Sequence, residues 1–209
     1  MRFNPETATA RIQRINEDRF TKYNTIIPPG PQILYNIGCG HHEFIAHDCF
    51  QWVNHDYVKR ASVNHVFDIQ EPWPLKTKSI SGILMQHVLE HTWEPVQVLN
   101  EAWRVLKPGG IAIITVPHYK DMTAWSDLTH RRAFTPKSLN TMTDKTRYRG
   151  RVSKNPSQEW WLGYSWYNLY QLNRAWMRYR FAGGHLWHWF RNISRISPEE
   201  ITWILSPMK

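Results

Sequence analysis

Four residues in the first third of this 209-residue sequence combine types and spacing that suit nucleotide binding. Gly38 and Gly40 follow the apolar run 33–37, where the chain must turn tightly and a ligand can approach bare backbone. Asp56 follows Gly38 by 18 residues, close to the spacing of about 20 at which a carboxylate meets a ribose in nucleotide-binding α/β folds. Asp68 ends the next apolar run. The pattern indicates a ribose site, and the alternative is a pair of turn glycines beside two surface carboxylates.

These residues are expected on one rim of a parallel sheet. The carboxyl ends of parallel strands lie on one edge, where such sheets bind their ligands. The predicted strands end at Gly38, Asp56, Asp68, Gln86 and Pro117. A third glycine and a phosphate-binding helix are missing, because Gly40 runs directly into His-His-Glu. The expected ligand therefore carries ribose and adenine but no pyrophosphate, and S-adenosylmethionine is the common example.

Alternating strand and helix patterns position this rim. Helices are predicted over 7–23, with Ile12, Ile15 and Phe20 as apolar positions, and over 94–106, where Lys-Pro-Gly-Gly follows. Short apolar runs bounded by turn residues predict buried parallel strands at 33–37, 52–54, 63–67, 83–85 and 111–116. This order favours an α/β fold with a largely parallel sheet.

The charge of the chain is concentrated in its last third. The net charge is +9, from 26 Lys and Arg against 17 Asp and Glu, and such a field attracts polyanions. Ten basic residues and one acidic residue lie in the segment 145–195, which also holds six of the 12 tryptophans. Cations and aromatics alternate over 174–181, which suits stacked bases and phosphates. The alternative is ordinary sheet packing, in which arginine stems cover apolar surface.

Length and cysteine content set the broad class. We expect one domain over 1–209: an N-terminal helix and linker at 1–31, a cofactor-binding core at 32–140, and a basic aromatic-rich acceptor region with the last strands at 141–209. Two cysteines cannot build a disulfide framework, and polar residues open the chain where a signal peptide would be apolar. No apolar run approaches the ~20 residues of a membrane span. A cytoplasmic protein is expected.

A series of motifs runs through residues 33 to about 140. They are Ile37-Gly-Cys-Gly40, Asn54-His-Asp56, Asp68-Ile-Gln-Glu-Pro-Trp-Pro74, His87-Val-Leu-Glu-His91, Arg104-Val-Leu-Lys-Pro-Gly-Gly110 and Asp127-Leu-Thr-His130. In order and spacing the series resembles class I S-adenosylmethionine-dependent methyltransferases, most closely the type 11 group. The resemblance implies a Rossmann-like fold, with a mostly parallel seven-stranded sheet and helices on both faces. Asn36 departs from the acidic residue common in the family, and Ser81-Gly82 from its usual Phe-Asp.

The resemblance also implies roles in cofactor binding. The glycine loop contacts the methionine moiety, Asp56 the ribose hydroxyls, and Asp68 with Ile69 the adenine, while Gln86 and His87 face the transferable methyl. The cofactor-binding residues expected in this chain are Asn36, Gly38, Cys39, Gly40, Asp56, Asp68, Ile69 and Gln86.

Catalysis is expected to rest on histidines of the same rim. Methyl transfer is an in-line displacement that requires alignment and exclusion of water but no metal, and a hydroxyl acceptor is helped by a base such as His. The candidate bases are His87, His91, His118 and His130, and we predict that Asp127 orients His130, with His87 opposite. In the resembling proteins this loop covers the active site. The alternative is that these are hydrogen-bonded loop residues with no catalytic task. The predicted substrate-binding residues are His118, Tyr119, Arg131, Arg178 and Arg180.

The segment 87–91 also matches H-x-x-E-H, the pattern of inverted zinc peptidases. That interpretation needs a continuous helix there and a third ligand further on. The preceding run 83–85 favours a strand, so no metal is expected.

The predicted function is methyl transfer from S-adenosylmethionine to a hydroxyl or amine of a nucleic acid or another polyanion. Neither the Pro-Pro-Tyr motif of amino-directed DNA methyltransferases nor a Pro-Cys pair for cytosine attack is present, which disfavours those routes. Two alternatives stay open. One is methylation of a glycan or small metabolite, and the other is a binding protein that keeps the fold without turnover.

Overall fold

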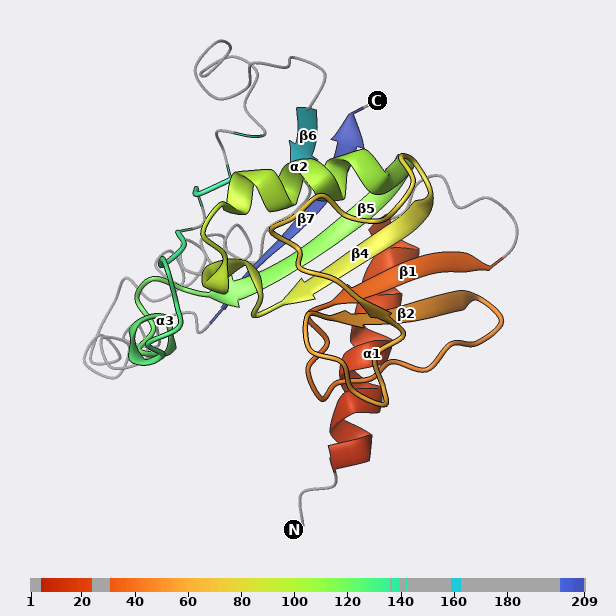
Figure 1. Cartoon of the computed structure of the whole chain (residues 1–209), viewed down its shortest axis with the longest axis horizontal. Helices are drawn as coiled ribbons and strands as arrows, with labels where there is room; N and C mark the ends of the chain where they lie inside the picture. Colours follow the sequence, from red (N-terminus) through yellow and green to blue (C-terminus); the bar gives the residue numbers. More distant parts are fainter. Residues whose placement is uncertain are drawn as a thin grey trace, which may run out of the picture.

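The seven-stranded sheet organises the molecule, as the computed structural model shows (Figure 1). The structure describes residues 5–23, 31–135, 137–139, 142, 159–162 and 200–208. Its strand order is β3-β2-β1-β4-β5-β7-β6. The strands are β1 (Gln32–Ile37), β2 (Phe50–Asp56), β3 (His65–Val66), β4 (Ile80–Gln86), β5 (Leu106–Pro117), β6 (Glu159–Leu162) and β7 (Glu200–Met208).

The central strands are parallel, and their register aligns their carboxyl ends. β1 pairs with β2 and β4, and β5 pairs with β4, all in parallel. β7 runs antiparallel to both β5 and β6. The predicted mostly parallel sheet is therefore confirmed, and its last two strands supply the antiparallel edge.

One face of the sheet is covered by α2 (Pro95–Val105). Pro95 starts this helix, a position where the missing N–H costs nothing. Val98, Leu99, Ala102 and Val105 are buried in the larger core cluster, together with β4 and β5 side chains. The helix ends one residue earlier than predicted because Leu106 already adopts an extended conformation as the first residue of β5.

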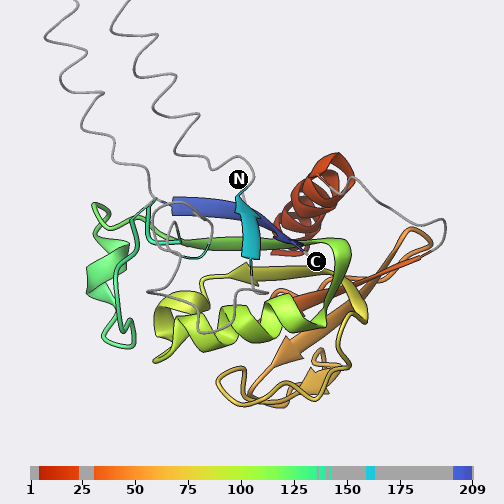
Figure 2. The ribbon, with the colours of Figure 1, turned by 90° about the horizontal axis from the view of Figure 1, so that it is seen from above.

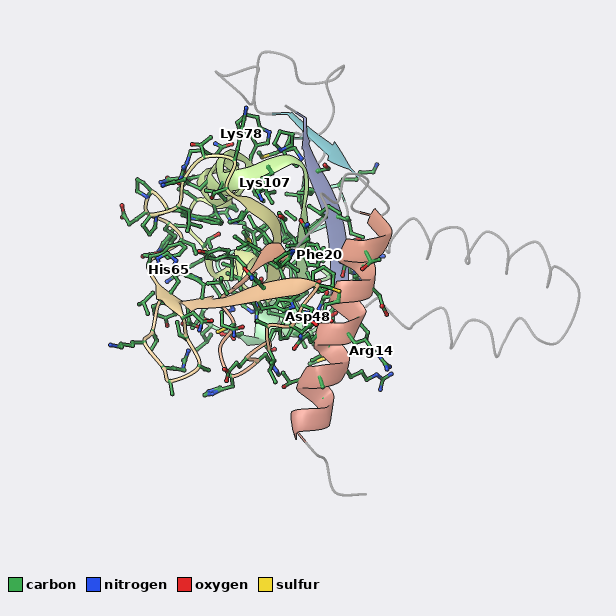
Figure 3. All side chains as sticks on the ribbon, turned by 90° about the vertical axis from the view of Figure 1, so that its right-hand side faces the viewer. Arg14, Phe20, Asp48, His65, Lys78 and Lys107 are labelled. Carbon is green, nitrogen blue, oxygen red and sulfur yellow. The ribbon has the colours of Figure 1, made fainter. Side chains whose placement is uncertain are left out.

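The other face carries α1 (Pro5–Tyr23), and Figure 2 shows the two helices on opposite sides of the sheet. Phe20 is buried in the second core cluster with Leu34, Trp52 and Leu84, and Figure 3 shows it on the sheet-facing side of α1. Helices on both faces are thus confirmed. Ile15, one of the three apolar positions expected in this helix, is instead 40% exposed.

Asn16 takes the buried position beside Ile15, because its amide donates to the Ile12 carbonyl within the helix and accepts from Arg19. Polar contacts also anchor the outer part of α1. Glu17 accepts a 2.8 Å hydrogen bond from the Trp52 indole, and Gln13 exchanges two hydrogen bonds with the Ile45 backbone. α1 is therefore held by both apolar and polar contacts.

Gly82 explains how closely α1 approaches the sheet. A Cβ at this position would lie 2.5 Å from Phe20 Cε1 and 2.6 Å from Leu34 Cδ2, closer than packed atoms allow. The departure at Ser81-Gly82 is thus a packing feature of this chain. None of the helices in the described part of the chain combines the length and hydropathy needed to cross a bilayer.

Candidate cofactor and acceptor site

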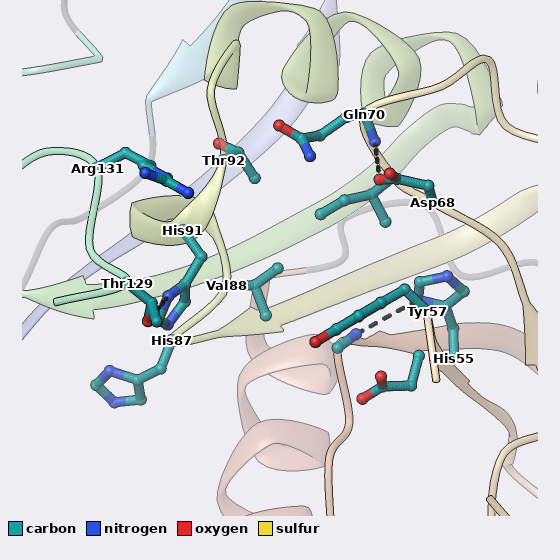
Figure 4. Close-up of a pocket in the computed structure, with 13 residues that line it drawn as sticks. His55, Tyr57, Asp68, Gln70, His87, Val88, His91, Thr92, Thr129 and Arg131 are labelled. Atoms are coloured by element: carbon teal, nitrogen blue, oxygen red, sulfur yellow. Dashed lines mark hydrogen bonds between the residues drawn. The ribbon is translucent and has the colours of Figure 1, made fainter. Parts of the chain in front are cut away.

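A cavity of about 460 Å³ opens at the carboxyl ends of β1, β2 and β4 (Figure 4). This volume falls within the usual range of small-molecule sites. Six predicted site residues line it, namely Gly38, Asp56, Asp68, Ile69, His87 and Arg131. The predicted site did not include six further lining residues, namely His55, Tyr57, Gln70, Val88, Thr92 and Thr129, whereas His91 was a candidate base. Proximity to predicted strand ends, or for Thr129 its place between Asp127 and His130, was the signal that could have found them.

Gly38 brings bare backbone to the cavity wall. It adopts φ +65°, and a Cβ would lie 2.5 Å from Val88 Cγ2, so a side chain is excluded on both counts. The adjacent turn is held by His55. The His55 carbonyl accepts a 2.8 Å hydrogen bond from the Cys39 N–H, and its Nδ1 accepts from the Gly38 N–H at 3.4 Å.

His55 can hold this turn because it is neutral. Burial lowers its pKa to about 4, and its Nε2–H donates to the Phe67 carbonyl at 2.9 Å. With Nε2 protonated, Nδ1 is free to accept from Gly38. The glycine turn thus depends on one imidazole tautomer.

Asp56 closes the glycine loop from the neighbouring strand. It accepts from Gly40 N–H at 2.9 Å and Val58 N–H at 3.0 Å, and it pairs with Arg60 at 3.1 Å. Burial acts to raise the pKa of Asp56, but these N–H groups and the Arg60 guanidinium outweigh it and hold the pKa below its ordinary value. An ionised carboxylate therefore lies where hydroxyls of a bound ribose could donate to it.

Asp68 and Ile69 form the opposite wall. Asp68 is exposed and caps the next turn by accepting from Gln70 N–H at 2.9 Å, whereas Ile69 is 9% exposed. Tyr57, 76% exposed, also lines the cavity. An apolar and an aromatic surface beside a carboxylate suit a planar base.

Asn36, Cys39, Gly40 and Gln86 are absent from the lining of this cavity. Asn36 is buried, and its Nδ2 donates to the His42 carbonyl and to Asn54 Oδ1. A carboxylate at position 36 could not donate to these two acceptor oxygens. The asparagine that replaces the family's acidic residue therefore suits its neighbours in this chain, Asn54 and the His42 carbonyl. Burial raises the pKa of Cys39 to about 11, which keeps it a thiol.

His87 lies between two carboxylates at the far end of the cavity. Its Nε2 contacts Glu200 at 3.0 Å and its Nδ1 lies 3.3 Å from Glu90. The interaction with Glu200 and, to a smaller extent, the one with Glu90 raise the pKa of His87 to about 9. Its φ is +53°, and the 3₁₀ turn η1 begins only at Leu89. The continuous helix that the zinc-peptidase pattern requires is therefore not formed.

Asp127 and His130 approach each other less directly than predicted. Asp127 Oδ2 is 3.8 Å from His130 Nε2, while Asp127 Oδ1 accepts from both the N–H and the hydroxyl of Thr129. His130 Nδ1–H instead donates to the Ala124 carbonyl, and its ring packs edge-to-face on His91 with centroids 4.7 Å apart. Of these two imidazoles, His91 is the one that lines the cavity.

The predicted substrate-binding residues do not all line the cavity. Arg131 lines the cavity, with its guanidinium 3.8 Å from the centroid of the Trp93 ring. His118 is 2% exposed, and its backbone pairs with Phe134, while Tyr119 beside it is 36% exposed; neither lines the cavity. Arg178 and Arg180, like most of the segment 145–195, lie outside the described residues.

Part of this chain is similar in sequence to known proteins. The family model described as "Methyltransferase domain" matches residues 36–114. A probable S-adenosylmethionine-dependent methyltransferase of Mycolicibacterium smegmatis is 36% identical over 45 residues, which are 22% of this chain and 18% of that protein. An uncharacterised 37.1 kDa protein of a Streptomyces fradiae transposon is 35% identical over 82 residues, 39% of this chain. The matches span only 18% and 23% of these two relatives' lengths.

Solved structures share the fold over nearly the whole chain. A methyltransferase from Archaeoglobus fulgidus matches with a TM-score of 0.58 at 16% identity, covering 97% of this chain and 94% of that one. The [4+2]-cyclase SpnF matches with a TM-score of 0.51 at 15% identity, covering 94% and 81%. Residues 36–114 thus match a methyltransferase domain model, and with the glycine loop, its strand-end carboxylates and the shared fold the chain is similar to class I S-adenosylmethionine-dependent methyltransferases.

Proposed function

We propose that the protein transfers a methyl group from S-adenosylmethionine to an acceptor that enters at the His87, His91, Thr129 and Arg131 end of the cavity. The observation that carries this proposal is the arrangement of one cavity with bare backbone at Gly38, ionised Asp56 on one wall, and polar side chains at the far end.

The residues present fit the cofactor. The cavity volume suits a molecule of its size, Asp56 can accept from ribose hydroxyls, and Ile69 and Tyr57 beside Asp68 offer surface to the adenine. When bound, the cofactor supplies an electrophilic methyl on a sulfonium. The chain's part is to hold that methyl in line with the acceptor and to exclude water.

The acceptor end is polar and carries both signs of charge. Arg131 is held over the Trp93 ring, Arg132 donates to the Trp93 carbonyl, and Glu200 lies beside His87. Such a surface suits an acceptor with hydroxyl groups and an anionic substituent. A nucleic acid or another polyanion remains our first candidate class, because the basic segment 145–195 follows this loop in sequence.

A glycan or small metabolite is the second candidate. It is favoured by the cavity lining, in which Arg131 is the one Lys or Arg side chain among the described residues. The fold alone does not decide the reaction, since the structural neighbour SpnF is named as a cyclase. A direct assay of transfer is therefore needed.

Cofactor binding is tested by calorimetric titration with S-adenosylmethionine and S-adenosylhomocysteine. We expect Asp56→Ala to weaken both at least tenfold, because it removes the ribose acceptor and the anchor of Gly40. Asp48→Ala, an exposed carboxylate outside the cavity, should bind as the parent does. Equal affinities in the two variants, or no binding by the parent protein, would contradict the proposal.

Transfer is tested with cofactor labelled at the methyl group and three acceptor pools: nucleic acid, polysaccharide and small metabolites. Label in one pool identifies the acceptor class. Cofactor binding with no label in any of the pools would support the alternative of a binding protein that keeps the fold without turnover.

A further inference from the structure

Glu90 is the most unusual charged residue near the cavity. It is 1% exposed, and among the described residues neither carboxylate oxygen has a hydrogen-bond donor of good geometry. Among the described residues its paired cation is His87, whose Nδ1 lies 3.3 Å from Oε1 while Nε2 contacts Glu200, so two carboxylates share one imidazole. A buried carboxylate that shares its cation is costly unless a further cation completes its surroundings.

Two imidazoles lie beside this carboxylate. One ligating atom from each of Glu90, His91 and His130 falls within 4.8 Å of the others. A metal about 2.1 Å from each would hold such atoms roughly 3.4 Å apart. Side-chain rotations that move these atoms by on the order of 1 Å would therefore bring them to metal-binding distances.

The hydrogen bonds around the two rings use Nδ1 of each, so Nε2 can bind a metal; His130 Nε2 lies 3.8 Å from Asp127 Oδ2, beyond hydrogen-bond distance. Thr129 donates its hydroxyl to Asp127, so its oxygen accepts from His91 Nδ1–H at 2.9 Å. His130 Nδ1–H donates to the Ala124 carbonyl at 3.2 Å. Metal-binding histidines are oriented in this way, with the second ring nitrogen donating to a carbonyl, a carboxylate or a group linked to one.

We propose that Glu90, His91 and His130 bind a divalent first-row transition metal at the acceptor end of the cavity. Two imidazoles and one carboxylate are a donor set suited to Zn²⁺ and its neighbours. Three protein ligands leave a further coordination position, as in catalytic zinc sites. Because His91 lines the cavity, a metal bound there is adjacent to the space that an acceptor would occupy.

The metal's catalytic role rests on the proposed function, whereas its binding does not. An acceptor hydroxyl on the open position has a lowered pKa and loses its proton to water. With S-adenosylmethionine bound, the oxygen would form a bond to the methyl carbon as the carbon–sulfur bond broke, and neutral S-adenosylhomocysteine would leave. The H-x-x-E-H pattern alone could not indicate this site, because the third ligand comes from the loop after β5.

The test is direct metal binding by the full chain without cofactor. Zn²⁺ is measured by calorimetry, and Co²⁺ by its visible absorption, which reports coordination geometry. We expect one equivalent per chain, and at least tenfold weaker binding in Glu90→Gln, His91→Asn and His130→Asn. Exposed residues of the same types provide the matched controls Glu43→Gln and His41→Asn, which should bind as the parent does.

The outcomes separate this proposal from the proposed function. No metal binding by the parent chain, or unchanged binding in all three variants, overturns the metal site even if methyl transfer is observed. Metal binding that depends on the three residues, in a protein that labels no acceptor, supports the site and counts against the transferase role. Thermal unfolding with S-adenosylhomocysteine shows which variants retain the fold.

Discussion

At the residue scale, His55 connects the fold to the cofactor site. Its ring is 1% exposed, accepts from the Gly38 N–H and donates to the Phe67 carbonyl. The contact with Gly38 requires the neutral ring, whereas the ring can donate to Phe67 in either protonation state. Protonation would place an Nδ1–H against the Gly38 N–H, so the glycine turn would lose one of its supports.

This requirement predicts acid sensitivity above the range in which carboxylates titrate. The folded-state pKa of about 4 lies below the ordinary value of 6.5, so the unfolded chain binds the proton more readily. The contribution of His55 to stability is complete above about pH 6.5 and is lost as the pH falls toward 4, on the order of 2 kcal/mol by pH 5. Chemical unfolding between pH 7.5 and 5 measures it.

The control for this prediction is a second histidine variant. His55→Gln should flatten the decline over this range, whereas His41→Asn, which changes an exposed ring, should leave it intact. An undiminished decline in His55→Gln would assign the acid sensitivity to other groups.

At the element scale, the site depends on segments that are distant in sequence. The antiparallel pairing of β7 with β5 brings Glu200 to His87 at the end of β4. The loop after β5 returns to the cavity because Arg131 N–H donates to the Glu90 carbonyl and His118 pairs with Phe134. These contacts place Thr129, His130 and Arg131 beside η1.

The packing of α1 on the sheet gives a second prediction. Gly82→Ala should destabilise the protein by about 1–3 kcal/mol, because the new Cβ would overlap buried atoms of Phe20 and Leu34. Ser81→Ala, on the next position of β4, should cost little, since its buried hydroxyl has no hydrogen-bond partner among the described residues. Denaturant unfolding measures both variants.

A double-mutant cycle distinguishes overlap from other effects. Phe20→Leu should cost stability in the parent but less in the Gly82→Ala background, because the smaller side chain leaves room for the new Cβ. If the two single-variant losses of stability add up in the double variant, Phe20 does not overlap the new Cβ at position 82.

At the scale of the whole molecule, charge and cofactor site occupy different parts of the sequence. The segment 145–195 accounts for the whole net charge of +9, while the matched methyltransferase region spans 36–114. A basic segment that follows this region in the sequence supports the proposed polyanionic acceptor, whose binding would release counterions.

The charge distribution predicts salt-dependent binding to nonspecific DNA or RNA. The logarithm of affinity should fall linearly with the logarithm of salt concentration, and replacing Arg178 and Arg180 with Gln should reduce the slope by about 1 to 2. Replacing Arg11 and Arg14, which are exposed on α1, provides the control for general loss of charge. A flat salt response would favour the glycan or metabolite acceptor.

The sequence alone determined the α/β class, the sheet and the cofactor rim, because these follow from local patterns: apolar runs ended by Gly38, Asp56 and Asp68. Tertiary structure decided which histidines meet. The prediction that Asp127 orients His130 did not include His91: Asp127 Oδ2 lies 3.8 Å from His130 Nε2, and its Oδ1 accepts from Thr129, which in turn accepts from His91. The tertiary structure also explains two departures from the family pattern: Asn36 donates a hydrogen bond to Asn54, and Gly82 leaves room for Phe20. Spacing along one chain reports strand ends, but a contact between two loops depends on how the sheet and its connections are packed in space.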